Sequence, residues 1–93
     1  MFEFSGQAVK IFKALSDPTR YEIIKMLCSC QELGCCELEK AFPLSKPALS
    51  HHYRVLENVG LISSRKEGAR IYYRLERERL ERFLPGFEGA HLP

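Results

Sequence analysis

Ninety-three residues with 45% hydrophobic side chains and a net charge of +2 are enough for one compact domain and too few for two. No apolar run reaches the length of a membrane span, and no basic stretch followed by an apolar one opens the chain, so we expect a cytoplasmic protein. In a reducing compartment the four cysteines are thiols, metal ligands or redox groups rather than structural disulfides.

The first half of the chain is predicted to form three helices. The first covers about residues 5–15, where apolar residues recur at helical spacing. Asp17 and Pro18 mark the start of the second, because an aspartate caps a helix well and a proline is tolerated in its first turn. The second helix is expected to end near residues 28–32, and a short third helix fits residues 36–42.

A fourth helix, capped by Ser45 and ended by Gly60, has one apolar and one polar face. A DNA major groove is about 12 Å wide and admits a single helix whose outer side chains are short or flexible. The outer face meets this requirement, although an ordinary amphipathic surface helix shows a similar pattern. Its residues are Lys46, Pro47, Ser50, His51 and Arg54.

Two short strands follow at residues 61–65 and 69–75, and the second alternates apolar with polar side chains as a half-buried strand does. The turn between them is basic, which suits contact with phosphates beside a groove. Its cations are Arg65, Lys66 and Arg70. A groove-sized helix followed at once by a cationic hairpin is the outline of a winged helix-turn-helix.

The ends of the chain carry more apolar residues than a domain this small can cover. A last helix is expected over residues 76–84, and residues 85–93 are expected to form a loosely ordered tail. A two-fold dimer would bury the apolar residues and present two reading helices about one DNA turn apart. The expected interface comprises Phe4, Val9, Phe12, Leu80, Phe83 and Leu84, unless these residues pack within one chain.

The expected fold is therefore α+β and mostly α: one winged helix-turn-helix domain over residues 1–93, with about five helices and a two-stranded β-hairpin wing. A glycine-rich phosphate loop, a nucleophile elbow and a plausible Ser/His/Asp arrangement are all missing from the sequence, which argues against an enzyme. Double-stranded DNA is the predicted partner, and a winged helix used for protein docking is the competing hypothesis.

Four stretches of the sequence carry a family resemblance. They are FKALSDPTR at 12–20, SHHYRVL at 50–56, GLI at 60–62 and GARIYYRL at 68–75. Together they resemble the ArsR/SmtB family of bacterial and archaeal transcriptional repressors over about residues 8–84. The resemblance implies a homodimer joined by the first and last helices, 1–15 and 76–84, a partly palindromic operator, and release when an inducer binds. It assigns DNA reading to Lys46, Pro47, Ala48, Ser50, His51 and Arg54, and the wing to residues 65–70.

All four cysteines lie within nine residues, at Cys28, Cys30, Cys35 and Cys36. The spacing differs from the separated C-x₂-C pairs of structural zinc sites. Thiolates favour soft ions, so we predict an inducer such as arsenic, antimony, cadmium or zinc, bound by Cys30, Cys35 and Cys36 with Cys28 as a further candidate. Reversible oxidation or persulfide formation is one alternative, and thiols without a sensing role are the other.

The family motif at the start of the third helix is not intact. Metalloid and heavy-metal sensors of the family carry Glu-Leu-Cys-Val-Cys-Asp-Leu, whereas residues 32–38 here read ELGCCEL. Cys36 matches the second family cysteine, Gly34 replaces the first, and Cys35 stands where valine is expected. A third family ligand would fall at Glu39. The family's zinc site on the last helix, built from Asp and His, looks absent.

Overall fold

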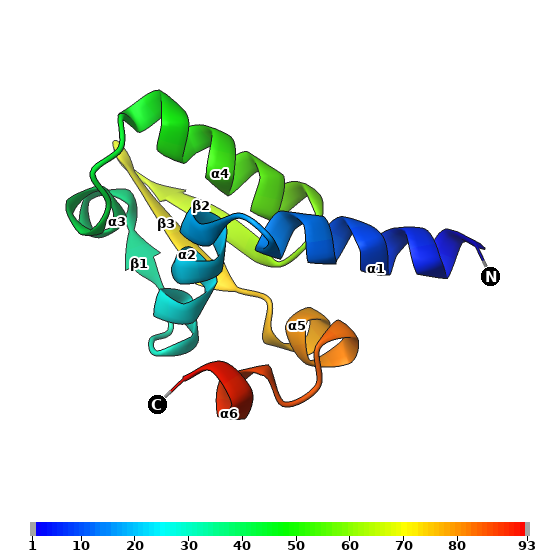
Figure 1. Ribbon diagram of the computed structural model, residues 1–93. Helices are drawn as coiled ribbons and strands as arrows, with labels where there is room; N and C mark the ends of the chain where they lie inside the picture. The colour runs from blue at the N-terminus through cyan, green and yellow to red at the C-terminus, as the bar shows by residue number, and fades with distance from the viewer. Residues whose placement is uncertain (1, 93) are drawn as a thin grey trace.

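The computed structural model describes the backbone of residues 2–92 and the side chains of residues 6–92, and this part of the chain forms six helices and three strands. In chain order they are α1 (Phe2–Leu15), α2 (Pro18–Cys28), β1 (Leu33–Gly34), α3 (Cys35–Ala41), α4 (Lys46–Asn58), β2 (Ile62–Glu67), β3 (Arg70–Leu75), α5 (Arg77–Phe83) and α6 (Phe87–His91). Figure 1 shows α4 at one side of the molecule, α5 and α6 at the other, and α1 projecting away from the body. The predicted α+β, mostly helical class is confirmed.

The starts of α2 and α4 are fixed by the same local chemistry. The Asp17 carboxylate accepts a hydrogen bond from the N–H of Arg20 at 3.0 Å, and Ser45 Oγ accepts one from the N–H of Ala48 at 3.3 Å. A proline stands in the first turn of each helix, where its missing N–H has no intrahelical partner to lose. Both helix starts therefore follow the prediction.

The core joins the helices to the wing. The predicted apolar face of α4 is buried through Leu49, Tyr53 and Leu56. The large side chains with less than 2% exposure are Ile11, Ile23, Ile24, Leu27, Leu38, Leu49, Leu56 and Leu61. These residues come from the first four helices and the entry to β2, so α4 is seated on the same core as α1 and α2. Within the described part of the chain, no helix is long and apolar enough to cross a bilayer.

The wing has three strands rather than the predicted two. β2 and β3 form the expected antiparallel hairpin, and Gly68 in its turn has a φ of 62°, a left-handed conformation that favours glycine. On the other edge of β3, the two residues of β1 pair with Tyr72 and Tyr73, in the order β1-β3-β2. A two-residue strand has no periodicity to recognise, which is why the sequence did not disclose it.

The C-terminal residues also differ from the loosely ordered tail expected over residues 85–93. Phe87 of α6 is 4% exposed, and its ring lies edge-on to that of Tyr21 in α2, with centroids 6.2 Å apart. Tyr21 Oη and His91 Nδ1 lie 2.9 Å apart. These contacts dock α6 on α2. The two partners Tyr21 and His91 are 70 positions apart in the chain, and no local sequence pattern predicts such a contact.

Tyr53 provides a test of the core. Its side chain is 4% exposed, and its hydroxyl has no hydrogen-bond partner among the described residues. A buried, unpaired hydroxyl is costly, so we expect Tyr53→Phe to raise the free energy of unfolding by about 1 kcal/mol in urea denaturation. Tyr21→Phe is the control, because it removes a hydroxyl that has a partner and should not stabilise. A less stable Tyr53→Phe protein would show that the hydroxyl is satisfied in solution.

Candidate nucleic-acid interface and cysteine segment

The outer face of α4 is exposed, as groove reading requires. Lys46, Pro47, Ser50, His51 and Arg54 are exposed, and Ala48 is half-buried. Among the described residues, none forms a hydrogen bond or ion pair with the side chains of Lys46, Ser50 or Arg54, so these groups are available to a partner. The face therefore offers short polar and flexible cationic side chains of the kind that read base edges and phosphates.

The inner side of α4 is held to the turn between α1 and α2. Arg20 Nε donates to the carbonyl of Ala14 at 2.7 Å, and Arg20 Nη1 lies 3.1 Å from His52 Nδ1. The Asp17 carboxylate lies 3.8 Å from the same ring nitrogen. Burial lowers the pKa of His52, and Asp17 partly opposes that effect. A neutral imidazole can accept the arginine hydrogen, so this contact positions the reading helix relative to α1.

Arg65, one of the predicted wing cations, is already occupied within the chain. Its Nε donates to Glu32 Oε2 at 3.0 Å, a second contact joins Nη2 to the same carboxylate, and Nη1 donates to Glu67 Oε2 at 3.0 Å. The guanidinium also lies over the ring of Tyr72, 4.5 Å from its centroid. Glu32, and after it Glu67, raises the pKa of Arg65 above its ordinary value. These contacts use three of the five N–H groups of Arg65 and hold the guanidinium in place, so Arg65 is less available to a phosphate than an unpaired cation.

Residues 28–36, hereafter the cysteine segment, are anchored at several points. The pairing of β1 with β3 holds one end of the segment, and Glu32 is bound by Arg65. At the other end, Arg77 Nη2 donates to the carbonyl oxygens of Leu27, Cys28 and Cys30 at 3.3, 3.1 and 2.8 Å. Sequence reasoning missed Glu32 and Arg77, because their partners lie 33 or more positions away along the chain.

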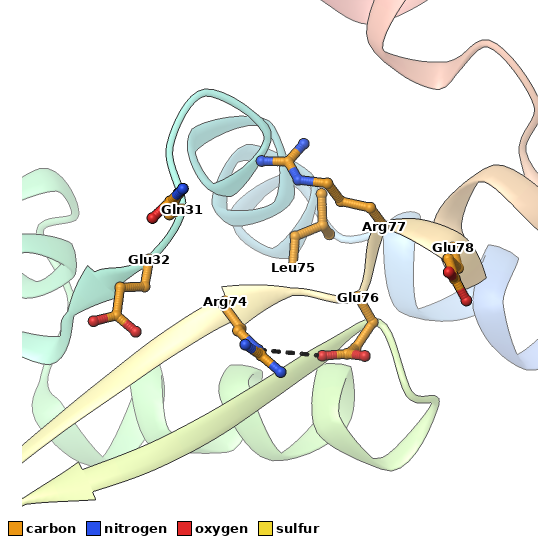
Figure 2. Close-up of a pocket in the computed structure, with 7 residues that line it drawn as sticks. All are labelled: Gln31, Glu32, Arg74, Leu75, Glu76, Arg77 and Glu78. Atoms are coloured by element: carbon orange, nitrogen blue, oxygen red, sulfur yellow. Dashed lines mark ion pairs between the residues drawn. The ribbon is translucent and has the colours of Figure 1, made fainter.

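A hollow of about 610 Å³ lies between the cysteine segment and the end of β3. Figure 2 shows Gln31 and Glu32 on one side and Arg74 and Glu76 on the other, with Arg77 reaching toward the end of α2. Arg74 pairs with Glu76 at 3.7 Å, and Arg77 is bound to backbone carbonyls. Because both arginines are engaged, the hollow is poorly suited to an anionic ligand.

The four thiols are free but differ in accessibility. Cys28 is buried, Cys30 and Cys35 are half-buried, and Cys36 is exposed. Burial raises the pKa of Cys28 to about 11 and also raises that of Cys30, whose Sγ lies 3.5 Å from the carbonyl oxygen of Met26. In the part of the chain that the structure describes, no three His, Cys, Asp or Glu side chains are grouped to hold a metal ion. The structure therefore does not gather Cys30, Cys35 and Cys36 around one point.

The candidate dimer residues lie in different environments. Val9 and Phe12 on α1 are 48% and 53% exposed, which is unusual for large apolar side chains that have no partner chain. Leu80 is 3% exposed and belongs to the core, with Phe83 and Leu84 packed partly against it. The side chain of Phe4 lies outside the described residues.

His52 gives a pH test of the α4 contact. Its pKa is lower in the folded protein than the ordinary 6.5, so the folded state binds fewer protons and stability is lost as pH falls through that value. We expect the loss of unfolding free energy between about pH 7 and pH 5 to be smaller in His52→Gln than in the unmodified protein. His51→Gln removes an exposed neighbour that contributes only a small part of the lowering of the His52 pKa, so it should retain most of the pH dependence. An equal loss of unfolding free energy in all three proteins would contradict the assignment.

Comparison with known proteins identifies relatives of one kind. Residues 17–64 match the model of the arsR family of bacterial regulatory proteins. Over 71 residues the chain is 45% identical to an arsenical resistance operon repressor of Staphylococcus xylosus, covering 76% of this chain and 67% of that one. It is 40% identical over 75 residues to a cadmium resistance transcriptional regulatory protein CadC homolog of Staphylococcus aureus, and the match covers 81% of this chain and 62% of that one. The chain thus spans about two thirds of the length of these relatives.

Solved structures agree with the fold. HlyU from Vibrio cholerae N16961 superimposes over all of both chains with a TM-score of 0.85 at 30% identity. An ArsR-like transcriptional regulator from Rhodococcus sp. RHA1 superimposes with a TM-score of 0.77 at 30% identity, covering 95% of this chain and 82% of that one.

Proposed function

The chain belongs to the arsR family of bacterial regulatory proteins, and from this premise we propose that it is a homodimeric repressor released from its operator by an inducer acting on the cysteine segment. Its family and relatives are DNA-binding transcriptional regulators and not enzymes. The observation that carries the proposal is the exposed, unpartnered outer face of α4 beside a cationic wing. Free cations on this face suit contact with DNA phosphates.

The proposed DNA contacts divide by chemistry. Ser50, His51 and Arg54 are assigned to base edges in the major groove. The residues at the start of α4, Lys46, Pro47 and Ala48, are assigned to positions near the sugar-phosphate backbone of the DNA. Lys66 and Arg70 of the wing are assigned to phosphates, which fix register but do not read sequence. Arg65 contributes less than these two residues while Glu32 and Glu67 hold it.

The proposed dimer forms through α1 and α5. The exposed Val9 and Phe12 on α1 support it, because water-exposed apolar side chains of this size favour burial against a partner. A two-fold axis would then place two copies of α4 at half-sites of a partly palindromic operator.

The proposed inducer is a thiophilic metal or metalloid ion, supported by relatives named for arsenical and cadmium resistance and by four free thiols in one segment. Cys30 lies before β1, whereas Cys35 and Cys36 follow it. A ligand that joins thiols from both sides of β1 must alter the path of the cysteine segment, since these thiols are not gathered beforehand. That path is tied to the wing through Glu32 and the β1–β3 pairing.

Removing a reading cation tests the DNA assignment. We expect Arg54→Ala and Arg70→Ala to weaken operator binding about ten-fold or more each and to reduce the slope of log affinity against log salt by about one. Lys25→Ala on α2, away from α4 and the wing, is the matched control and should bind normally. If the affinity for the operator changes neither with salt concentration nor with either substitution, the result favours a protein-docking function instead.

Glu32→Gln tests the contact that occupies Arg65. Releasing Arg65 should strengthen operator binding several-fold. It should also make the slope of log affinity against log salt concentration steeper by about one, because one more phosphate is neutralised. Glu22→Gln removes a carboxylate on α2 that also pairs with a cation, Lys25, and it controls for the change in net charge; Glu22 is the more exposed of the two, at 49% against 31% for Glu32. Equal affinities of the two variants would show that Glu32 does not restrain Arg65.

An ion-and-oxidant panel tests the inducer. The reduced protein is titrated with arsenite, cadmium, zinc and peroxide, and both the thiol count and operator binding are measured. We expect a soft ion to weaken operator binding about ten-fold or more, an effect within the usual range of allosteric coupling, and Cys36→Ser to abolish the response. If peroxide acts while every ion fails, the thiols respond to oxidation rather than to metal.

A further inference from the structure

The adjacent thiols at the start of α3 open onto a hollow that also contains two cations. Its volume is about 260 Å³, and α3 and β3 supply its walls. The lining includes Cys35, Cys36, Lys40, Arg70 and Tyr72. Cys36 is the exposed thiol of the pair and Cys35 is half-buried, so a molecule entering this hollow meets Cys36 without any opening of the fold.

The charges around this hollow favour an anion. Its acidic residue, Glu37, is engaged: the carboxylate accepts a hydrogen bond from the N–H of Gly34 at 3.2 Å. Neither Lys40 nor Arg70 forms an ion pair with any described carboxylate. Cys36 and Arg70 both line this hollow, so the guanidinium and the thiol share one site. The exposed thiol of Cys36 thus stands in a hollow lined by two cations and one carboxylate, which leaves a net positive charge.

We propose that Cys36 exchanges with anionic low-molecular-weight disulfides whose carboxylates are bound by Lys40 and Arg70. The Cys36 thiol first loses its proton to solvent, and the thiolate attacks one sulfur of the disulfide. A new S–S bond forms while the S–S bond of the reagent breaks, and the departing thiolate takes the electron pair and then a proton. Cys36 is oxidised to a mixed disulfide, and the departing half of the reagent is reduced to a thiol.

The adduct places carboxylates next to Arg70. They compete with DNA phosphate for the guanidinium and add negative charge at the wing, so operator binding weakens. This consequence rests on the proposed function, whereas the exchange reaction at Cys36 does not. The reaction needs one accessible thiol and two cations, and it is therefore distinct from chelation of an ion by several thiols.

The experiment compares reagents of different charge on the reduced 93-residue protein. Oxidised glutathione is the anionic probe, hydroxyethyl disulfide the neutral one and cystamine the cationic one, and mass spectrometry with peptide mapping follows the adduct on Cys36. At low salt, Lys40→Gln and Arg70→Gln should each slow the reaction with oxidised glutathione, relative to that with hydroxyethyl disulfide, on the order of three-fold, and should speed the reaction with cystamine relative to the same neutral reagent. The ratio to the neutral reagent removes any effect of the cations on the reactivity of the thiol itself. Lys25→Gln, on α2, should change none of the rates.

An adduct mapped to another cysteine overturns the proposal, and so does an oxidised glutathione rate that is unchanged in both cation variants. Cys36→Ser should lose the adduct altogether. Operator binding of the purified adduct is then compared with that of the reduced protein. If the adduct forms with the expected charge preference but binds the operator normally, the exchange site stands and the assignment of Arg70 to DNA fails.

Discussion

The pairing of β1 with β3 is the contact on which the rest of the structure depends. Through it two residues of the cysteine segment become part of the wing sheet, and Arg77 fixes the other end of the segment by three backbone carbonyls. The thiols and the hairpin proposed to contact DNA therefore belong to one body. A free loop with the same cysteines could take up a ligand without any effect on the wing.

Internal ion pairing sets the effective charge of the wing. The hairpin carries four cations, but Arg65 is bound by Glu32 and Glu67, and Arg74 lies 3.7 Å from Glu76. Among the described residues, this leaves Lys66 and Arg70 as the hairpin cations without a carboxylate partner. A wing with moderate net charge suits the proposed release from DNA, because each phosphate contact adds affinity that an inducer would have to overcome.

Packing divides the cysteines into two chemical types. α6 docks on α2, and burial raises the pKa of Cys28 to about 11, with the Glu88 carboxylate of α6 adding to the effect. Cys28 thus behaves as a small core residue. For this cysteine, the structure favours the hypothesis of a thiol without a sensing role. Cys35 and Cys36 follow β1 in the chain and line the hollow that also contains Lys40 and Arg70. The chemistry available to the cluster therefore depends on where each thiol sits more than on the spacing of the cysteines.

The sequence by itself determined the elements whose signals are local. The caps at Asp17 and Ser45, the two faces of α4 and the glycine turn of the wing follow from short-range hydrogen bonds and periodicity, which act between near neighbours whatever the rest of the fold does. Those signals were enough to predict the winged helix and the exposed reading face. Only the tertiary structure decided that β1 joins the wing, that Arg65 is held by Glu32, and that the thiols are not gathered at one point. These features join residues far apart in the chain, so they depend on how the helices and the sheet pack rather than on any neighbouring residue.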